Sequence, residues 1–519
     1  MCSFYFKLLS WLLVVQGVSH LTASAEGSKQ LNQNGGNRAY INASLTATPC
    51  NPFPMPATVW VYVKNGERFY LGSSAQGIGT GTIIMRDPNG NLYSTGNSAI
   101  VGRINNRNEE VVGPTAVLGD GGYVTFTRLI SAADEGVWEI AFIPPDINAT
   151  TPPPPIAASG NWVQPANSSY IAAFDVTVKS TGGGFVPGRV FTKVLNLNMG
   201  SPNTGFRGNL RILTDSGYQY TLNPNGFGSN ADFSIVANNK GFKNASGGPS
   251  HSSVNSLNGY IDPRIPDTGD DVTYKLFFNT PASSLPTQAP IFGGTTWLLR
   301  TPVTVWANGI TFTGAGDTLN TGGNFTLTTV GTGKYEIFLD INKNNSYTDT
   351  VDKVFTGYAT STTTIIPWDG TDGLGAQVSA TGNYNVKVHM GRQEVHLFII
   401  DVENNPNGFV LTRTNGFSPN DSVYWNDNGL PLIDTPSAPI TNLTGISSTV
   451  NGHRYGSSTY PDSSFGSGIA IDTWTYTQNN VSIFELSLTP TDATRKYSAL
   501  PVMQKRPTRL VCQDITKCW

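Results

Sequence analysis

Gly136-Val137-Trp138-Glu139-Ile140-Ala141-Phe142 places a glycine, a spacer and an aromatic ring directly before a run of alternating residues. The same order recurs at Gly333-Lys334-Tyr335-Glu336-Ile337-Phe338-Leu339 and at Gly382-Asn383-Tyr384-Asn385-Val386-Lys387-Val388. Alternation with a period of two is typical of a strand that buries one face. These stretches therefore predict three strands, each entered through a turn glycine and anchored by a ring.

The amino-acid composition of the whole chain also favours β-strands joined by turns. Of 519 residues, 56 are Gly, 33 are Pro and only 13% are charged, about half the usual ~25%. Apolar residues reach 38%, which excludes a wholly disordered chain, and no long window keeps a helical apolar period. Immunoglobulin-like sandwiches use a glycine corner and a ring between two sheets in this way. We expect an all-β protein of tandem immunoglobulin-like β-sandwich domains in an elongated array.

Residues 1–25 are typical of a secretory signal peptide. Lys7 supplies the positive charge, residues 8–18 are mostly apolar, and Ala23-Ser24-Ala25 forms an A-x-A cleavage site before Glu26. The apolar run is too short for a membrane anchor, and no later segment approaches the length of a transmembrane span. We expect a secreted, extracellular protein that is soluble or attached to the cell surface.

Pro-rich stretches divide the chain. Residues 150–156 and 286–297 are predicted linkers, and a third division falls near residues 404–407. These boundaries predict a β-sandwich domain at 26–149, a β-rich domain at 157–285, an immunoglobulin-like sandwich at 298–402 and a β-rich domain at 403–490.

The tail at 491–519 differs in charge from the rest of the chain. It carries Arg495, Lys496, Lys505, Arg506, Arg509 and Lys517 against few acids. Both a natural basic tail and the altered end of a longer protein fit this pattern. The tail also holds Cys512 and Cys518, whose pairing stays open, and Cys50 is the third cysteine after the signal peptide.

The overall charge says little about a partner. Lys and Arg number 32 and Asp and Glu 35, a formal net charge of −3. That balance gives no reason to expect a nucleic acid.

Two short stretches predict β-hairpins. Asn65-Gly66, between residues 58–63 and 68–71, suits a type I′ turn, and Asp215-Ser216-Gly217 lies between residues 210–214 and 218–222. In the first hairpin, alternation places Trp60 and Tyr62 on one face. These rings, with Phe69 and Tyr70, either belong to the core or form an exposed platform that stacks on sugars.

One loop carries candidate metal ligands. Asp340, Asn342, Asn344, Asp349 and Asp352 follow a predicted strand directly, and such side-chain oxygens can converge on calcium. The pattern departs from an EF-hand, because Asn345 stands where the hand has Gly and the last acid comes one position late. The two interpretations are a structural Ca²⁺ site and an Asn/Asp turn that bonds its own backbone.

No motif singles out a catalytic site. Gly77-Ile78-Gly79-Thr80-Gly81 lacks the following helix that a phosphate loop needs. The histidines His251, His389, His396 and His453 are scattered and form no H-E-x-x-H motif.

Residues 366–375, Ile-Pro-Trp-Asp-Gly-Thr-Asp-Gly-Leu-Gly, together with Gly382-Asn383-Tyr384-Asn385-Val386, resemble the immunoglobulin-like domain of the flagellar hook-capping protein. The resemblance covers about 300–402 and implies that Trp368 packs inside a sandwich while Asp369-Gly370 turns the chain.

More widely, residues 40–485 resemble the N-terminal part of large secreted surface proteins of the Bacteroidota, exported by the type IX system and including adhesin-like proteins. The supporting stretches include Gly136-Val137-Trp138-Glu139-Ile140, residues 71–79, 238–242, 401–409 and 420–425. This resemblance implies a location and a modular role and brings no catalytic residue.

These observations favour a non-enzymatic, adhesin-like surface protein with a structural or binding role toward an unidentified surface glycan or protein. The alternative is a carbohydrate-binding or polysaccharide-processing accessory protein.

Overall fold

The computed structural model describes residues 26–490 except 50, 116–120, 201–203, 230–231, 256–258, 317, 392, 417–419, 432–438, 457–464, 467 and 478–479. The predicted signal peptide at 1–25, the basic tail at 491–519 and Cys50, Cys512 and Cys518 lie outside the described residues.

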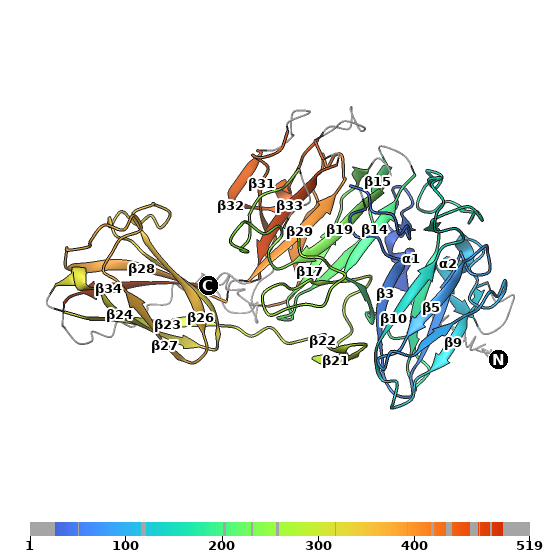
Figure 1. The fold of residues 1–519 in the computed structure, drawn as a ribbon, viewed down its shortest axis with the longest axis horizontal. Helices are drawn as coiled ribbons and strands as arrows, with labels where there is room; N and C mark the ends of the chain where they lie inside the picture. The colour runs from blue at the N-terminus through green and yellow to red at the C-terminus, as the bar shows by residue number, and fades with distance from the viewer. Residues whose placement is uncertain are drawn as a thin grey trace, which may run out of the picture.

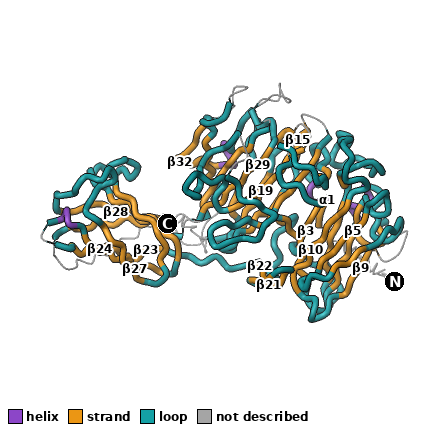
Figure 2. Tube along the Cα trace, in the orientation of Figure 1, coloured by secondary structure: helices purple, strands orange, loops and turns teal. Residues whose placement is uncertain are grey.

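The all-β prediction is confirmed. Strands and loops make up nearly all of the described chain (Figure 2). The helical elements among the described residues are α1 (Ser28–Leu31), α2 (Arg107–Val112), α3 (Ser448–Asn451) and the 3₁₀ turn η1 (Leu319–Thr321). None of the described helices is long and apolar enough to cross a membrane.

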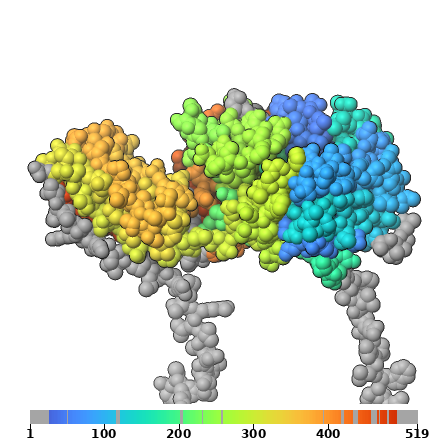
Figure 3. Space-filling view, turned by 60° about the horizontal axis from the view of Figure 1, so that its bottom comes forward, coloured from blue at the N-terminus to red at the C-terminus, as the bar shows by residue number. Residues whose placement is uncertain are grey.

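The strands form two lobes that lie side by side along the long axis (Figures 1 and 3). Each lobe has its own apolar core: one core runs from Leu31 to Phe278 and from Val395 to Ile471, and the other from Val305 to Met390 and from Phe484 to Leu488. We call them the larger lobe and the sandwich lobe.

Three sheets build most of the larger lobe. The first has the order β22 (Gly294–Trp297), β21 (Gln288–Ile291), β10 (Gly136–Ile143), β3 (Ala57–Val63), β13 (Val190–Thr192), β20 (Lys275–Phe277), β16 (Leu210–Leu213), β17 (Gln219–Asn223), β30 (Val410–Arg413), with β5 (Thr82–Arg86) on β10 and β6 (Leu92–Ser94) on β5. The second has the order β11 (Tyr170–Ile171), β2 (Tyr40–Asn42), β14 (Val194–Asn198), β19 (Asp232–Asn238), β29 (Glu394–Ile400), β33 (Ala470–Tyr476), β31 (Ser422–Asn426), β32 (Thr441–Ser447). The third has the order β1 (Glu26–Gly27), β12 (Phe174–Lys179), β4 (Arg68–Ser73), β9 (Phe126–Leu129). Two small pairs complete the lobe, β15 (Thr204–Phe206) with β18 (Phe227–Ser229) and β7 (Pro114–Thr115) with β8 (Tyr123–Val124).

Strand β3 is covered by apolar side chains on both of its faces. All of its residues are buried, because Val59, Val61 and Val63 point into the main core while Trp60 and Tyr62 pack in a second apolar cluster on the opposite face. Since both faces are covered, Trp60 and Tyr62 are core residues and form no exposed sugar platform. Phe69 is fully buried as well.

The first predicted hairpin is wrong and the second is confirmed. β3 and β4 belong to different sheets, so the turn at Gly66 carries the chain from one sheet to another. The carboxylate of Glu67 accepts the Lys64 N–H. It also lies 3.4 Å from Arg189, so the turn is held by side-chain contacts and not by pairing of β3 with β4. β16 pairs with β17 around Gly217, as expected.

Among the described residues, the sandwich lobe has seven strands in two sheets. One sheet has the order β23 (Trp306–Gly314), β24 (Gly323–Val330), β27 (Thr363–Trp368), and the other β26 (Lys353–Ala359), β25 (Gly333–Leu339), β28 (Gly382–Met390), β34 (Asn480–Leu488). The rings that follow the three repeated glycines, Trp138, Tyr335 and Tyr384, are all buried. The Tyr384 hydroxyl donates to the Ala380 carbonyl at 2.6 Å, so the ring fixes the entry to β28 as the pattern predicted.

The sheets cross the boundaries drawn from the sequence. β3 pairs with β13 across the Pro-rich stretch 150–156, β17 pairs with β30, and the sandwich takes its last strand, β34, from 403–490. Strands from different predicted segments therefore share sheets. The reason lies in the Pro-rich stretches that were expected to separate the segments. The Pro-rich stretches pack on the lobe instead of spacing domains: Tyr40 donates to the Pro154 carbonyl, and Ala289 joins the cluster around Trp60.

The chain passes between the lobes near Gln393 and again near Thr477. The β28–β34 ladder reaches the pair Met390 and Asn480, and the β29–β33 ladder begins at Glu394 and Tyr476. Between them the Thr477 N–H donates to the Gln393 carbonyl at 2.9 Å. Backbone pairing is thus described on both sides of this junction, up to Met390 and Asn480 in the sandwich lobe and from Gln393 and Thr477 in the larger lobe.

Candidate metal centres

The five predicted calcium ligands lie in one loop, which joins Leu339 at the end of β25 to Lys353 at the start of β26. Asp340 and Asp352 are 0% and 3% exposed. Asn342 and Asn344 are exposed, and Asp349 is half-buried. The loop therefore has two buried carboxylates at its base and amides at its surface.

Hydrogen bonds fold this loop onto its own acids. Asp340 accepts the N–H groups of Asn344 and Asn345 at 3.2 and 2.9 Å. The side-chain amides of Asn342 and Asn344 both donate to Asp349 Oδ2, at 3.0 and 2.6 Å. These contacts match the turn interpretation and hold Asn342, Asn344 and Asp349 together. Within the described part of the chain, the carboxylates of Asp340, Asp349 and Asp352 do not bring three oxygens within 4.8 Å of one another.

The carboxylates at the base of the loop are not neutralised. Among the described residues neither Asp340 nor Asp352 forms an ion pair, and Asp352 Oδ2 is buried without a hydrogen-bond partner. Burial raises the pKa of Asp352, and the charges of Asp340 and Asp349 raise it further. A bound cation would relieve this repulsion.

The turn that follows β27 supports the loop from outside. Gly373 donates its N–H to the Val351 carbonyl at 2.9 Å. A Cβ on Gly373 would lie 2.3 Å from the carbonyl oxygens of Thr350 and Asp352, so only glycine permits this approach. The position of Asp352 depends on that contact.

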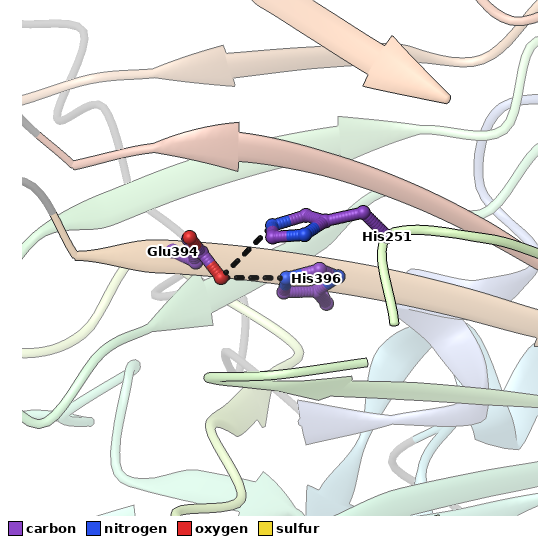
Figure 4. A group of neighbouring side chains, drawn as sticks. All are labelled: His251, Glu394 and His396. Atoms are coloured by element: carbon purple, nitrogen blue, oxygen red, sulfur yellow. Dashed lines mark hydrogen bonds and ion pairs between the residues drawn. The ribbon is translucent and has the colours of Figure 1, made fainter. Parts of the chain in front are cut away.

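A second cluster lies in the larger lobe and contains His251, Glu394 and His396 (Figure 4). Glu394 and His396 are two positions apart on β29, so both point to one face. His251 reaches them from a loop after β19. The Nε2 atoms of His251 and His396 each lie 3.3 Å from the same Glu394 Oε2 atom, so three donor atoms converge on one point.

A neighbouring carboxylate orients one imidazole. Asp472 on β33 lies 2.9 Å from His396 Nδ1, which leaves Nε2 directed at Glu394. Gly241 fits against this pair, because a Cβ there would lie 2.4 Å from Asp472 Oδ2 and 2.6 Å from His396 Nδ1. The Trp474 ring lies 5.8 Å from the His396 ring in a stacked arrangement.

The charges of the cluster are strongly coupled. Burial alone would raise the pKa of Glu394, but His251 and His396 outweigh it and hold that pKa below its usual range. Burial alone would lower the pKa of His396, but Asp472 and Glu394 raise it to about 9. The acids thus favour a positive charge at this position, whether a proton or a metal ion.

These histidines do not follow the helical H-E-x-x-H spacing, so that motif did not predict the cluster. On a strand the corresponding signal is Glu394-Val395-His396, an acid and an imidazole at i and i+2. The partners His251 and Asp472 are far away in sequence, and only sheet pairing between β29 and β33 brings Asp472 to His396.

The other two histidines stand apart from this cluster. His453 lies between Asp427 and Thr473, with Nε2 2.9 Å from Asp427 Oδ2, and stacks on Trp425. His389 lies in the sandwich lobe beside Phe338.

Comparison with known proteins adds no relative. No family model matches the chain, and no curated protein matches it. The function has to be inferred from the residues themselves.

Proposed function

We propose that this protein is exported and works at the cell surface as a non-catalytic, adhesin-like β protein with a structural or binding role, in the manner of the secreted Bacteroidota surface proteins that it resembles. The observation that carries the proposal is the environment of Glu26, the residue directly after the expected cleavage site.

Glu26 occupies a buried site with two carboxyl groups and no ion-pair partner among the described residues. Its backbone nitrogen lies 3.0 Å from Asp175 Oδ1, and both residues are almost fully buried. Burial raises the pKa of Asp175 to about 6 and that of the Glu26 side chain to about 8. Cleavage after Ala25 would convert the Glu26 nitrogen into an α-ammonium group and supply the missing positive charge.

A chain that begins at Glu26 should therefore be more stable than one that begins one residue earlier, at Ala25. The difference should be about 1.5–3 kcal/mol, the range for a hydrogen bond to a charged group. Denaturant unfolding measures it, and Asp175→Asn should abolish it because the charge of the acceptor is lost. Equal midpoints for the two chains, or an exported protein whose N-terminal residue is not Glu26, would refute processing at this site.

Calcium is the second part of the proposal. The buried, unneutralised pair Asp340 and Asp352 supports a structural Ca²⁺ ion in the sandwich lobe, held with Asn342, Asn344 and Asp349. Carboxylates and amide oxygens are the ligands that calcium prefers. The amides of Asn342 and Asn344 would have to flip about their Cβ–Cγ bonds to turn oxygen in place of nitrogen toward Asp349. The ion would join β25 to β26 and stiffen the lobe.

Millimolar calcium should raise the melting temperature of the sandwich lobe, and a chelator should reverse the effect. A ligand that binds only the folded state adds about 2.7 kcal/mol at a hundredfold excess over Kd, and extracellular sites have Kd values of roughly 10⁻⁴–10⁻³ M. Differential scanning calorimetry on the whole chain measures the shift, since residues 298–402 alone would lack β34.

Variants make this experiment specific. Asp340→Ala and Asp352→Asn should remove the calcium-dependent shift, whereas Asp369→Asn, which alters an exposed acid on the neighbouring loop, should keep it. Equal melting temperatures with and without calcium in the unaltered protein would leave only the turn interpretation.

The alternative, a carbohydrate-binding or polysaccharide-processing role, loses most of its sequence argument, because Trp60, Tyr62 and Phe69 are core residues and Tyr70 is half-buried. A glycan array with the purified protein distinguishes the two roles: selective glycan binding would favour the alternative.

A further inference from the structure

We propose that His251, Glu394 and His396 bind a divalent transition-metal ion of the zinc class in the larger lobe, with one coordination position left open. This site is independent of the calcium site and goes beyond the proposed function, because it lies in the other lobe and uses different ligand atoms.

The donor set fits such an ion. Two imidazole nitrogens and one carboxylate oxygen form a ligand set that zinc uses with a water in the fourth position. Imidazole ligands favour zinc, copper and nickel over calcium and magnesium. All three donor atoms lie within 4.8 Å of one another.

The distances fit a shared ion better than direct hydrogen bonds. Zinc bonds of 2.0–2.1 Å in a tetrahedron place neighbouring ligand atoms roughly 3.3 Å apart. Both imidazole nitrogens lie 3.3 Å from Glu394 Oε2, whereas a charge-assisted N–H···O⁻ bond is typically about 2.7–2.9 Å.

His251 Nε2 is buried, and its one polar neighbour given among the described residues is Glu394 Oε2, at 3.3 Å. The side chain as a whole is nevertheless 38% exposed. That combination directs the donor atom inward and leaves the outer side of the ring open to solvent, from which an ion and a water can enter.

The surrounding contacts hold the ligands in place. Asp472 accepts from His396 Nδ1, an arrangement that typically orients metal-binding histidines. The loop of His251 is fixed on both sides, because Ser250 donates its N–H to the Phe242 carbonyl and Ser253 to the Asn426 carbonyl. His251 itself adopts φ +49°, a left-handed conformation that persists where the surroundings impose it.

The site lies where the chain enters the larger lobe, so a bound ion would also affect that junction. Glu394 is the first residue of β29 and directly follows Gln393, where the chain from the sandwich lobe enters the larger lobe and pairs with Thr477. An ion at Glu394 would tie this entry point to the His251 loop. Its open position would accept water or a donor atom from a bound molecule.

Isothermal titration of the purified protein with Zn²⁺, in millimolar calcium so that the other site is filled, tests the proposal. We expect one equivalent of zinc to bind. His251→Ala and Glu394→Gln should lose this binding, and Asp472→Asn should weaken it by roughly 10–100-fold, the usual effect of removing a supporting carboxylate.

His389→Gln is the matched control, since it removes an imidazole from the sandwich lobe and should bind zinc as the unaltered protein does. Circular dichroism identifies any variant that fails to fold. His251→Ala is the decisive variant, because its side chain is partly exposed and lies on a loop. Zinc binding that survives in a folded His251→Ala protein, or its absence from the unaltered protein, would overturn the proposal.

Discussion

Glu110→Ala should lower the free energy of unfolding of the larger lobe by about 3–5 kcal/mol, the range for removing one partner of a buried ion pair. Arg38 Nη2 lies 2.8 Å from each Glu110 oxygen, and the two side chains are 0% and 1% exposed. Burial alone would raise the pKa of Glu110, but Arg38 and Arg107 hold it below its usual range.

Two more donors depend on the same carboxylate. The Ser28 hydroxyl and the Trp162 indole N–H donate to it at 2.6 and 2.8 Å. The alanine variant would leave these groups and a buried guanidinium without their acceptor, and each loss costs free energy.

Denaturant unfolding, followed by a probe of the larger lobe, measures the effect. Glu109→Ala is the matched control, because Glu109 is the neighbouring acid on α2 and its bonds to Asn105 and Asn106 are exposed. We expect a change below about 1 kcal/mol there. Similar losses for the two variants would show that burial of the pair does not set the cost.

Trp368→Ala should destabilise the sandwich lobe by about 3–5 kcal/mol, the usual cost of emptying a large aromatic site. The side chain is 4% exposed and packs against Phe312 and Phe325, with ring centroids 5.7 and 5.8 Å away. Its indole N–H donates to the Thr371 carbonyl at 2.8 Å, so the variant also frees the turn that supports the calcium loop.

The melting temperature of the sandwich lobe reports this loss. Trp306→Ala serves as the control in the same lobe, because Trp306 is 40% exposed and should change stability by less than about 1 kcal/mol. If both tryptophan variants melt like the unaltered protein, the packing described for Trp368 is wrong.

Local pattern was sufficient to predict several strands and the rings that anchor them. Gly382 and Tyr384 define the start of β28, and the burial of Trp368 was expected from its motif. The loop from Asp340 to Asp352 was also recognisable, because its five side chains lie close together in sequence and hydrogen bonds within the loop link Asn342 and Asn344 to Asp349. Each of these features depends on neighbours a few residues away.

Pairing over long distances could not be predicted in the same way. The strand alternation of β3 is equally compatible with an exposed face and with two buried faces, and only the packing of Leu285, Ala289 and Leu298 against Trp60 decides between them. Likewise, Asn65-Gly66 favours a turn but does not determine which sheet the following strand joins.

The sequence by itself thus determined the all-β class, the positions of most anchoring rings and one candidate metal loop, because period-two alternation, turn glycines and clustered acids act locally. The tertiary structure decided the two-lobed arrangement, in which β34 returns to close the sandwich. It also assembled the cluster of His251, Glu394 and His396. The physical reason is that sheet partners and converging side chains are selected by burial and hydrogen bonding between segments that are far apart in the chain.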